Sequence, residues 1–466
     1  MPCKMKKIPL SNTKWFVQRS LTLCVIAFCF EASALSVDEY TSALIKTHPY
    51  FLQLSLSEKA SLIDQQAALS YADWNIRGFV NNSATSRPYS DLSITVYEVS
   101  ARKNIEQTGG NISLSHSWSR NNRDGLISGT NVIGLDYSQP LLQNKGGLND
   151  RLGADLAAIE VTVQALSRAE QSESFVASRV KRLIDLVLAQ EKESIYRQQL
   201  ALTVSQLELA ENKRSSGLIE LSEVLSERDA KSRAEQQWLQ SQQELSLLKQ
   251  ELAAQVDIHP SEMVVEFDLY QQHNIAQVDV EAVLPELRAI QQIQLERQKL
   301  LRQRQSLENK LLPSINLNIG LSTQGEANYY LDGFSSQDQS WRVGIDVSYQ
   351  LGQNKATLDF QLSEISLARL NMRQLEVEMN TKQQINVFAA QVDLFGQMMQ
   401  MSLEQKQIAE DKLHEEMLRY SNARGQKNWL IATEKTLNMM NLAYAQAAAA
   451  YQKVVVEYRS IIDQLL

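Results

Sequence analysis

The sequence predicts a mainly α-helical protein built from a duplicated unit, in which β-strands are followed by a very long helical hairpin. Three observations predict this fold. Two long stretches lack helix-breaking residues, two shorter segments alternate apolar and polar residues, and one motif recurs at the same point of both halves. Helices as long as these stretches do not fit within one compact domain, so we expect the 466-residue chain to be elongated.

The amino terminus is typical of a secretory signal peptide over residues 1–34. Basic residues come first, a short apolar core runs from Leu21 to Phe30, and Ala32-Ser33-Ala34 matches a small-residue cleavage site. The apolar core has about half of the ~20 residues that span a bilayer, which disfavours the alternative of an anchoring helix. We therefore expect export, with the mature chain starting at Leu35.

Cysteine and charge usage narrow the class of protein. Cys3, Cys24 and Cys29 all lie in this leader, so the mature chain is expected to form no disulfide. Leu23 and Phe28 precede the latter two, where a lipid-anchoring motif needs a small residue. The formal net charge of -8 argues against nucleic acid as a partner. No other segment has the length of a transmembrane helix, so we expect any insertion into a membrane to use β-strands.

The placement of proline and glycine marks the helices. No proline lies between Pro140 and Pro260, and none follows Pro313. These stretches are rich in Ala, Leu, Gln, Glu, Lys and Arg, which are strong helix formers. One helix face is predicted from the spacing of Val180, Leu183, Ile184 and Val187. A heptad row predicts a helix–helix seam in the core and comprises Leu351, Leu358, Ile365, Met372 and Met379.

Alternation of apolar and polar residues predicts strands in two islands. The second island runs from Ser314 to Tyr349, with a polar external loop over residues 322–340. The first island begins at Trp74 and ends near Tyr137. Within it, residues 92–119 predict an additional hairpin around Gly109-Gly110, and the pattern leaves open whether that hairpin extends outside a membrane.

The exits from the two islands repeat each other. Gly134-Leu-Asp-Tyr-Ser-Gln-Pro-Leu-Leu-Gln-Asn-Lys145 and Gly344-Ile-Asp-Val-Ser-Tyr-Gln-Leu-Gly-Gln-Asn-Lys355 are identical at seven of twelve positions without a gap. A gapless match at the same architectural point indicates an internal duplication.

These patterns divide the chain into eight segments. In the first half we expect the signal peptide (1–34), an N-terminal helix (35–71), strands with the extra hairpin (72–139) and a long coiled-coil helical hairpin (140–255). An equatorial linker (256–284) leads to a helix (285–312), a strand pair (313–350) and a second long coiled-coil hairpin (351–466). The first arm of each hairpin is expected to be a rod of roughly 110 Å.

This duplicated plan resembles the TolC-like family of outer-membrane efflux proteins over essentially the whole mature chain. The resemblance rests on the order of local signals: a capping box at Ser36-Val-Asp-Glu39, a helix end at Leu44 to Pro49, a strand exit at Tyr137-Ser-Gln-Pro140 and a hairpin tip from Gly217 to Glu223. It implies a homotrimer in which each chain supplies four strands to a shared 12-stranded membrane β-barrel, continued by an α-helical tunnel in the periplasm. Open sheet edges are not tolerated in lipid, so no stable monomeric pore is expected.

The resemblance also implies the role and the partners. Substrates would leave an inner-membrane pump of the RND, ABC or MFS class, pass a periplasmic adaptor protein and exit through the trimer, in efflux or in type I secretion. The barrel would lie in outer-membrane lipid, and no cofactor is implied. The sequence does not distinguish small toxic molecules from a secreted polypeptide as cargo.

By the same resemblance, hairpin tips at Gly217 and Gly425 would narrow the tunnel at its periplasmic end. Glu223 matches an acidic tip position, Lys427 its basic partner and Glu434 an acidic ring position. A Glu–Lys link would hold the tip closed, and a carboxylate ring would favour cations.

Two observations leave this assignment open. Arg419-Tyr420 lies two residues farther from Gly425 than the family spacing, and Ile431 replaces a second acidic position. If Ala423 occupies the glycine position, Lys427 loses its assigned role. The alternative is that these residues are ordinary solvated charges, each contributing about 0–1 kcal/mol.

The sequence contains no catalytic constellation. The five histidines are dispersed without ligand spacing, and no glycine loop of the phosphate-binding kind occurs. We therefore expect neither an enzyme nor a metal or cofactor protein. The competing class is a periplasmic adaptor, a structural coiled-coil protein with β-domains and one helical hairpin, which two equivalent long hairpins disfavour.

Overall fold

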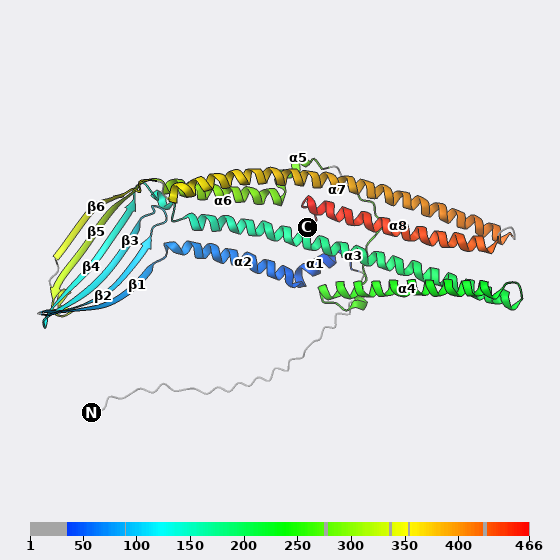
Figure 1. The fold of residues 1–466 in the computed structure, drawn as a ribbon, viewed down its shortest axis with the longest axis horizontal. Helices are drawn as coiled ribbons and strands as arrows, with labels where there is room; N and C mark the ends of the chain where they lie inside the picture. Colours follow the sequence, from blue (N-terminus) through cyan, green and yellow to red (C-terminus); the bar gives the residue numbers. More distant parts are fainter. Residues whose placement is uncertain are drawn as a thin grey trace, which may run out of the picture.

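The computed structural model describes residues 35–88, 90–274, 278–334, 338–352, 355–422 and 426–465. The molecule is elongated, with a sheet at one end and long helices that run away from it (Figure 1). The predicted signal peptide, its three cysteines and Gly425 lie outside the described residues.

All the strands lie in one antiparallel sheet, in chain order. They are β1 (Asn75–Arg87), β2 (Ser90–Asn104), β3 (Asn111–Arg123), β4 (Leu126–Pro140), β5 (Ser314–Ala327) and β6 (Asp338–Ser348). The additional hairpin predicted from the sequence is β2–β3, and it pairs along its full length between β1 and β4. The prediction of four strands per chain is therefore wrong for this chain, which has six strands in the sheet. The closed barrel of three chains is not tested by the open sheet of one chain.

The helices make up most of the chain. The α-helices are α1 (Val37–Thr47), α2 (Pro49–Leu69), α3 (Leu152–Ser215), α4 (Leu221–Val256), α5 (Val280–Val283), α6 (Arg288–Lys310), α7 (Lys355–Ser421) and α8 (Lys427–Ile461). Short 3-10 turns are η1 (Ser70–Ala72), η2 (Lys145–Gly147), η3 (Pro260–Glu262), η4 (Leu284–Glu286) and η5 (Asp332–Phe334). None of the helices in the described ranges combines the length and the apolar character needed to cross a bilayer.

The helical segment predicted over 35–71 consists of two helices, and the break between them falls within Leu44 to Pro49, where the sequence analysis placed a helix end. The predicted capping box is confirmed: the Ser36 hydroxyl accepts a hydrogen bond from the Glu39 N–H at 3.2 Å, and the Glu39 carboxylate accepts one from the Ser36 N–H at 3.0 Å. The chain leaves the helix at His48, with ψ of 128°. Because Pro49 follows, its ring disfavours a helical conformation at His48 and then suits the first position of α2.

The two longest helices begin later than predicted. α3 begins at Leu152 rather than at 140, and its 64 residues span roughly 96 Å. Before it, Asn144, Gly146 and Gly147 have φ of 62°, 67° and 68°, a left-handed conformation that a right-handed helix cannot include. α7 begins at Lys355, after Gly352 with φ of 103°, and its 67 residues span about 100 Å.

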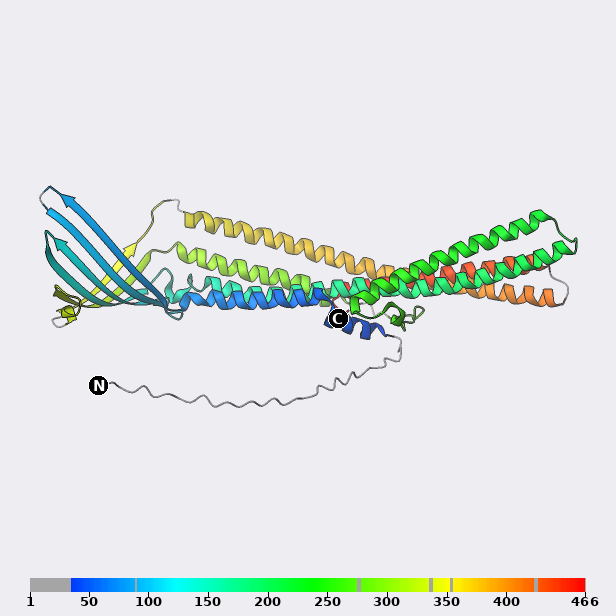
Figure 2. The ribbon, with the colours of Figure 1, turned by 90° about the horizontal axis from the view of Figure 1, so that it is seen from below.

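The helices lie side by side in a single layer. Next to the sheet the order is α2, α3, α6 and α7, and toward the opposite end it is α4, α3, α8 and α7 (Figures 1 and 2). α3 and α7 run through both halves, so each contributes to the whole length of the layer. One edge of the layer is formed by α2 and α4, and the other by α7.

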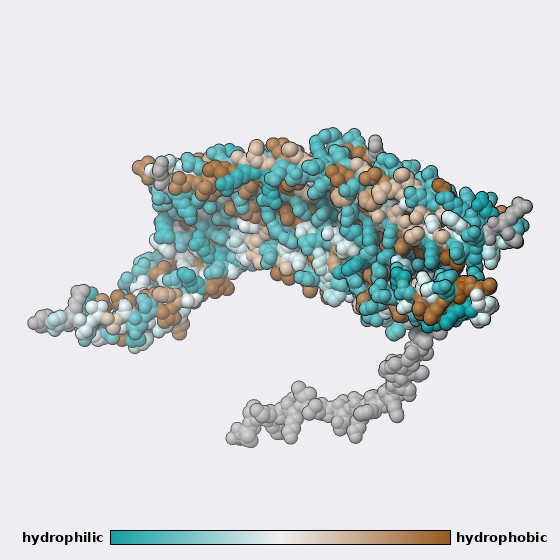
Figure 3. Space-filling model, turned by 45° about the vertical axis from the view of Figure 1, so that its right-hand side comes forward, coloured by the Kyte–Doolittle hydropathy of each residue, from teal (hydrophilic) through white to brown (hydrophobic). Residues whose placement is uncertain are grey.

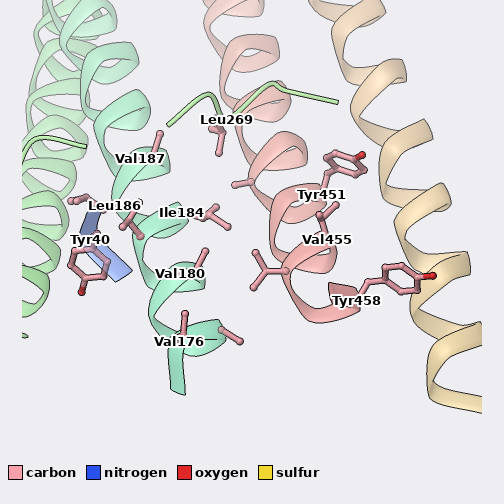
Figure 4. Packing of buried hydrophobic residues seen from close by; sticks show 14 of the residues in the cluster. Tyr40, Val176, Val180, Ile184, Leu186, Val187, Leu269, Tyr451, Val455 and Tyr458 are labelled. Carbon is pink, nitrogen blue, oxygen red and sulfur yellow. The ribbon is translucent and has the colours of Figure 1, made fainter. Parts of the chain in front are cut away.

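The hydrophobic core lies midway along the rod. The face predicted from Val180, Leu183, Ile184 and Val187 is buried there. Side chains of α3 face those of α8, and Leu269 of the linker packs beside them (Figure 4). Tyr40 of α1 and Leu252 of α4 belong to the same core. We call this region the waist.

The predicted heptad row is exposed rather than buried within the chain. Leu358, Ile365, Met372 and Met379 lie between 49% and 70% exposed along α7. Figure 3 shows hydrophobic side chains on the surface along the upper edge of the molecule, where α7 lies. The helical period was read correctly from Leu358 onward, whereas Leu351 lies before α7, and the row does not pack against another element of the described chain. α2, at the opposite edge, exposes apolar side chains in the same way at Leu52, Leu56 and Ile63.

A buried ion cluster joins three helices at the waist. The Arg288 guanidinium, at the start of α6, pairs with Glu173 of α3 and lies 3.6 Å from both Glu170 and Asp463. The backbone N–H of Arg288 also donates a hydrogen bond to the Asp463 carboxylate at 2.7 Å. Burial lowers the pKa of Arg288, but the hydrogen bond to Glu173 and the surrounding carboxylates raise it overall, so the residue stays charged.

We predict that Arg288→Ala destabilises the protein by about 3–5 kcal/mol, because the Glu173 side chain, 1% exposed, would keep a buried charge without its partner. Thermal unfolding of the purified protein in detergent measures this, with Arg182→Ala as the control, since Arg182 is half exposed. Equal unfolding temperatures for the two variants would contradict the structural role of the cluster.

Candidate functional site

The two faces of the sheet differ in polarity. One face, here called the apolar face, carries exposed apolar side chains on every strand: Ile76, Val80, Tyr97, Val99, Leu114, Leu135, Ile319, Leu321, Val343 and Ile345. The opposite face, here called the polar face, carries Arg77, Ser115, Asp136, Asn318 and Arg342, among others. The strand register keeps each set on its own side across the whole sheet.

A glycine on β5 permits an ion pair across the polar face. Arg342 of β6 donates to the Asp136 carboxylate of β4 at 2.6 Å, although β5 lies between the two strands. The pair passes over Gly320, where an added Cβ would lie 2.6 Å from the Asp136 carboxylate and 2.8 Å from Arg342 Nε. Any side chain at this position would therefore displace the pair.

The connection between β5 and β6 folds back onto the apolar face. It is shorter than the predicted loop of 322–340, because β5 continues to Ala327 and β6 starts at Asp338. The Tyr330 ring lies 5.7 Å from that of Trp118. Beneath the connection, His116 Nε2 lies 2.9 Å from Asn131 Oδ1, so the connection covers a polar pair on an otherwise apolar surface.

The far end of the layer holds the tip of the first hairpin, where the sequence places Gly217. Gly217 has φ of 70°, and its N–H donates to the Arg214 carbonyl at 2.9 Å. The next N–H, on Leu218, donates to the Lys213 carbonyl at 2.9 Å. This is the hydrogen-bond pattern of a helix that ends in a left-handed residue, which glycine adopts without steric cost.

A cavity of about 360 Å³ lies at the tips and joins both hairpins. Glu223 of α4 and Lys427 of α8, which the sequence analysis singled out, both line it. No ion pair joins them in the described part of the chain, so the link between these two residues stays a prediction. The second predicted tip glycine, Gly425, lies outside the described residues, as does Ala423.

Glu434 lies on α8 between Ala432 and Lys435, which both line the cavity, but does not line it itself. Burial raises the pKa of Glu434, and the positive charge of Lys427 acts against that rise. The two predicted residues of α8 therefore interact through their charges, while Glu434 takes up a proton more readily than an ordinary glutamate.

The sequence analysis missed other polar residues of the cavity. They are Gln206 and Lys213 of α3, Glu227 of α4 and Lys435 of α8. Gln206 is 4% exposed, and neither its amide oxygen nor its amide nitrogen has a hydrogen-bond partner; one Glu227 carboxylate oxygen is also unpaired. Helical spacing was a usable signal, since Glu227 follows Glu223 by four residues and Lys435 follows Lys427 by eight.

The described ranges contain no group of three or more His, Cys, Asp or Glu side chains arranged to hold a metal ion. The groups that distinguish the sheet and the tips are charged and polar side chains facing open space, which fits binding or passage of solutes.

Known proteins resemble this chain in structure but not in sequence. No protein-family model and no curated protein sequence matches it. The outer-membrane protein VceC of Vibrio cholerae has a TM-score of 0.68 at 13% identity, over 92% of this chain and 96% of that one. CusC, described in connection with transmembrane channel formation, has a TM-score of 0.70 at 10% identity, over 91% of both chains. The open-state MtrE outer-membrane channel of Neisseria gonorrhoeae has a TM-score of 0.66 at 12% identity, over 92% and 89%. The chain therefore has the fold of these outer-membrane channels, as the TolC-like resemblance predicted.

We predict that Gly217→Ala loosens the first tip at a cost of about 1 kcal/mol, because the cost comes from the left-handed backbone alone: an added Cβ would meet no atom within 4 Å. Hydrogen exchange of the Leu218 amide should become faster. Gly153→Ala is the matched control, since Gly153 is equally open but lies within helix α3, where alanine is favoured. Unchanged exchange at Leu218 would contradict the prediction.

Proposed function

We propose that the protein is one subunit of a homotrimeric outer-membrane channel, which exports substrates from an inner-membrane pump and its periplasmic adaptor through a gated helical tunnel. The observation that carries this proposal is the pair of unsatisfied edges along the whole molecule. β1 and β6 each have one side without a strand partner in the sheet. The helical layer ends in exposed apolar side chains of α2 and α4 on one side and of α7 on the other.

The two edges are formed by different strands and helices, so a contact that pairs them joins unlike surfaces of two copies. A contact between unlike edges is head-to-tail, and such contacts repeat until a ring closes. In a ring, α7 of one copy packs against α2 and α4 of the next, and β6 meets β1. Every exposed apolar row named above then acquires a partner, including the heptad row of α7. Three copies are the number that the family resemblance implies.

The polarity of the sheet supports its place in the outer membrane. In a closed ring of strands the apolar face would contact lipid and the polar face would line a water-filled lumen. No strand edge would then be left without hydrogen bonds in the hydrocarbon layer. The helices would continue this lumen as a tunnel across the periplasm, where the tips meet the adaptor.

The mechanism requires no chemistry in this chain. Substrate would enter at the tips and diffuse through the lumen, and the energy for transport would come from the pump. The cavity at the tips is the proposed gate, with Glu223 and Lys427 among the charged residues that line it and Glu434 beside it on α8. A periplasmic adaptor is the alternative function; its single hairpin does not match the two hairpins of this chain, each about as long as the other.

Replacing an apolar residue on the α7 edge should prevent assembly. Met372→Asp places an unpaired charge in the proposed contact and should weaken each contact by about 3–5 kcal/mol. Chemical crosslinking in detergent then yields monomers in place of trimers. Asn371→Asp adds the same charge on the neighbouring, exposed residue and should leave the trimer intact. A monodisperse monomer from the unmodified protein would overturn the proposed assembly.

Single-channel conductance in a planar bilayer tests the gate. The unmodified trimer should show a small, cation-selective conductance, which rises when Glu223→Ala is combined with Lys427→Ala. The control removes the exposed pair Lys231 and Glu235, which lie 4.0 Å apart on α4 away from the cavity. Equal conductance in all three proteins would make Glu223 and Lys427 ordinary surface charges, and no conductance from assembled trimers would contradict the channel itself.

A further inference from the structure

The four strands of the first half are two hairpins of equal size. β1 and β3 each have 13 residues, and β2 and β4 each have 15. Every bound of the second hairpin lies 36 residues after the corresponding bound of the first: 75 and 111, 87 and 123, 90 and 126, 104 and 140. β2 and β3 therefore extend over the full height of the sheet and are not a short insertion within a loop.

Strands β2 and β3 carry apolar side chains on the same face of the sheet as their neighbours do. Tyr97 and Val99 of β2 and Leu114 of β3 continue the apolar face from Val80 across to Leu135. Tyr97 also stacks on Trp118, with 5.4 Å between the ring centroids. A strand pair that left the membrane would not need a row of apolar side chains in register with its neighbours.

The helix-side turn of this segment is locked to the junction between sheet and helices. The Gly146 N–H donates to the Thr108 carbonyl at 3.1 Å, and the Gln139 side-chain amide donates to the same carbonyl at 2.8 Å. Gly109 approaches the backbone so closely that an added Cβ would lie 2.3 Å from the Gly147 nitrogen. The helix-side turn of the hairpin is thus held against the segment that leads from the sheet to α3.

The circumference of the ring of helices can be compared with that of the ring of strands which would continue it. Four helices per chain reach the sheet side by side, so three chains present twelve. Twelve helices spaced about 8–10 Å apart form a ring of about 96–120 Å. Strands about 4.8 Å apart and tilted by about 40° give roughly 75 Å for twelve strands and roughly 113 Å for eighteen. Of these two rings of strands, the one of eighteen is closer in circumference to the ring of helices.

We propose that the sheets of three copies close into an eighteen-stranded barrel, in which β6 of each copy pairs with β1 of the next and the β2–β3 hairpin widens the pore to the circumference of the tunnel. This rests on the proposed trimeric channel and adds the composition of its membrane pore. A wall of this size leaves an aqueous passage rather than a side-chain-filled interior. The tips, and not the barrel, would then be the narrowest part of the path.

The two edges are complementary in charge as well as in polarity. Where β5 and β6 pair, their helix-side ends are flush, with Ser314 opposite Ser348. The same flush arrangement between copies places Arg77 of β1 opposite Asp346 of β6 on the polar face. Neither residue has an ion pair within the described chain, whereas Asp136 and Arg342 on the same face are paired.

Electron cryomicroscopy of the purified trimer, viewed along its long axis, tests the proposal directly. A continuous ring of eighteen strands is expected. A trimer with twelve strands in the ring and β2–β3 outside it would overturn the proposal while leaving the proposed channel intact. Particles that form no ring of three chains would overturn both.

A deletion variant tests the consequence for the pore. Removing residues 88–123 joins Arg87 to the Asp124-Gly125 turn, so that Arg87 takes the place opposite Leu126 that Arg123 now has. The barrel should narrow by one third, and the largest polyethylene glycol that enters the channel from the barrel side should become smaller. An unchanged size limit in the assembled variant would show that β2–β3 does not contribute to the wall.

Discussion

A layer that is one element thick cannot bury its own edges, and this constraint governs the rest of the molecule. The strands and the long helices of the layer have neighbours only to their sides, so the first and last elements of the layer lack one partner. For the sheet the missing partner leaves backbone N–H and C=O groups of β1 and β6 unpaired. For the helices it leaves apolar rows on α2 and α7 in contact with water. Both deficits lie on the same two sides of the molecule, so the head-to-tail contact that we propose between copies would remove both.

The sequence predicted those parts of the fold that depend on residues close together along the chain. The helical period around Ile184 and the capping box at Ser36 involve residues within one or two turns, and both predictions are confirmed. The heptad row through Met372 was equally clear as a period, but periodicity does not say which surface a row packs against. The structure places it at the edge of the chain, where only a second copy would bury it. Helix starts were misplaced where Asn144 and Gly352, between a strand and a helix, adopt positive φ angles that the composition of these segments did not indicate.

The candidate sites show the same division between local and distant information. Glu223 and Lys427 were found by their positions near hairpin tips, yet the cavity that contains both is formed by the two helices of the first hairpin, α3 and α4, together with the distant helix α8. Gln206 was invisible because nothing near it in the sequence marks a tip. The ion pair of Asp136 and Arg342 was missed for a related reason, since it depends on Gly320 in the strand between them. The number of strands was misjudged because the resemblance supplied four, although the alternation within residues 92–119 was recorded.

The distribution of packing along the rod explains why a gate at the tips is mechanically reasonable. Buried apolar side chains concentrate at the waist, where Arg288 also ties α3, α6 and the end of α8 together. Toward the tips packing becomes sparse: in the described part of α7 and α8, no residue is buried between Ala409 and Tyr444. Segments with few buried contacts open at low free-energy cost, whereas the core resists opening. The unpaired polar groups of Gln206 and Glu227 reduce the stability of the packing at the tips further. If the tips form the gate, as we propose, their opening would therefore cost less free energy than any rearrangement of the waist.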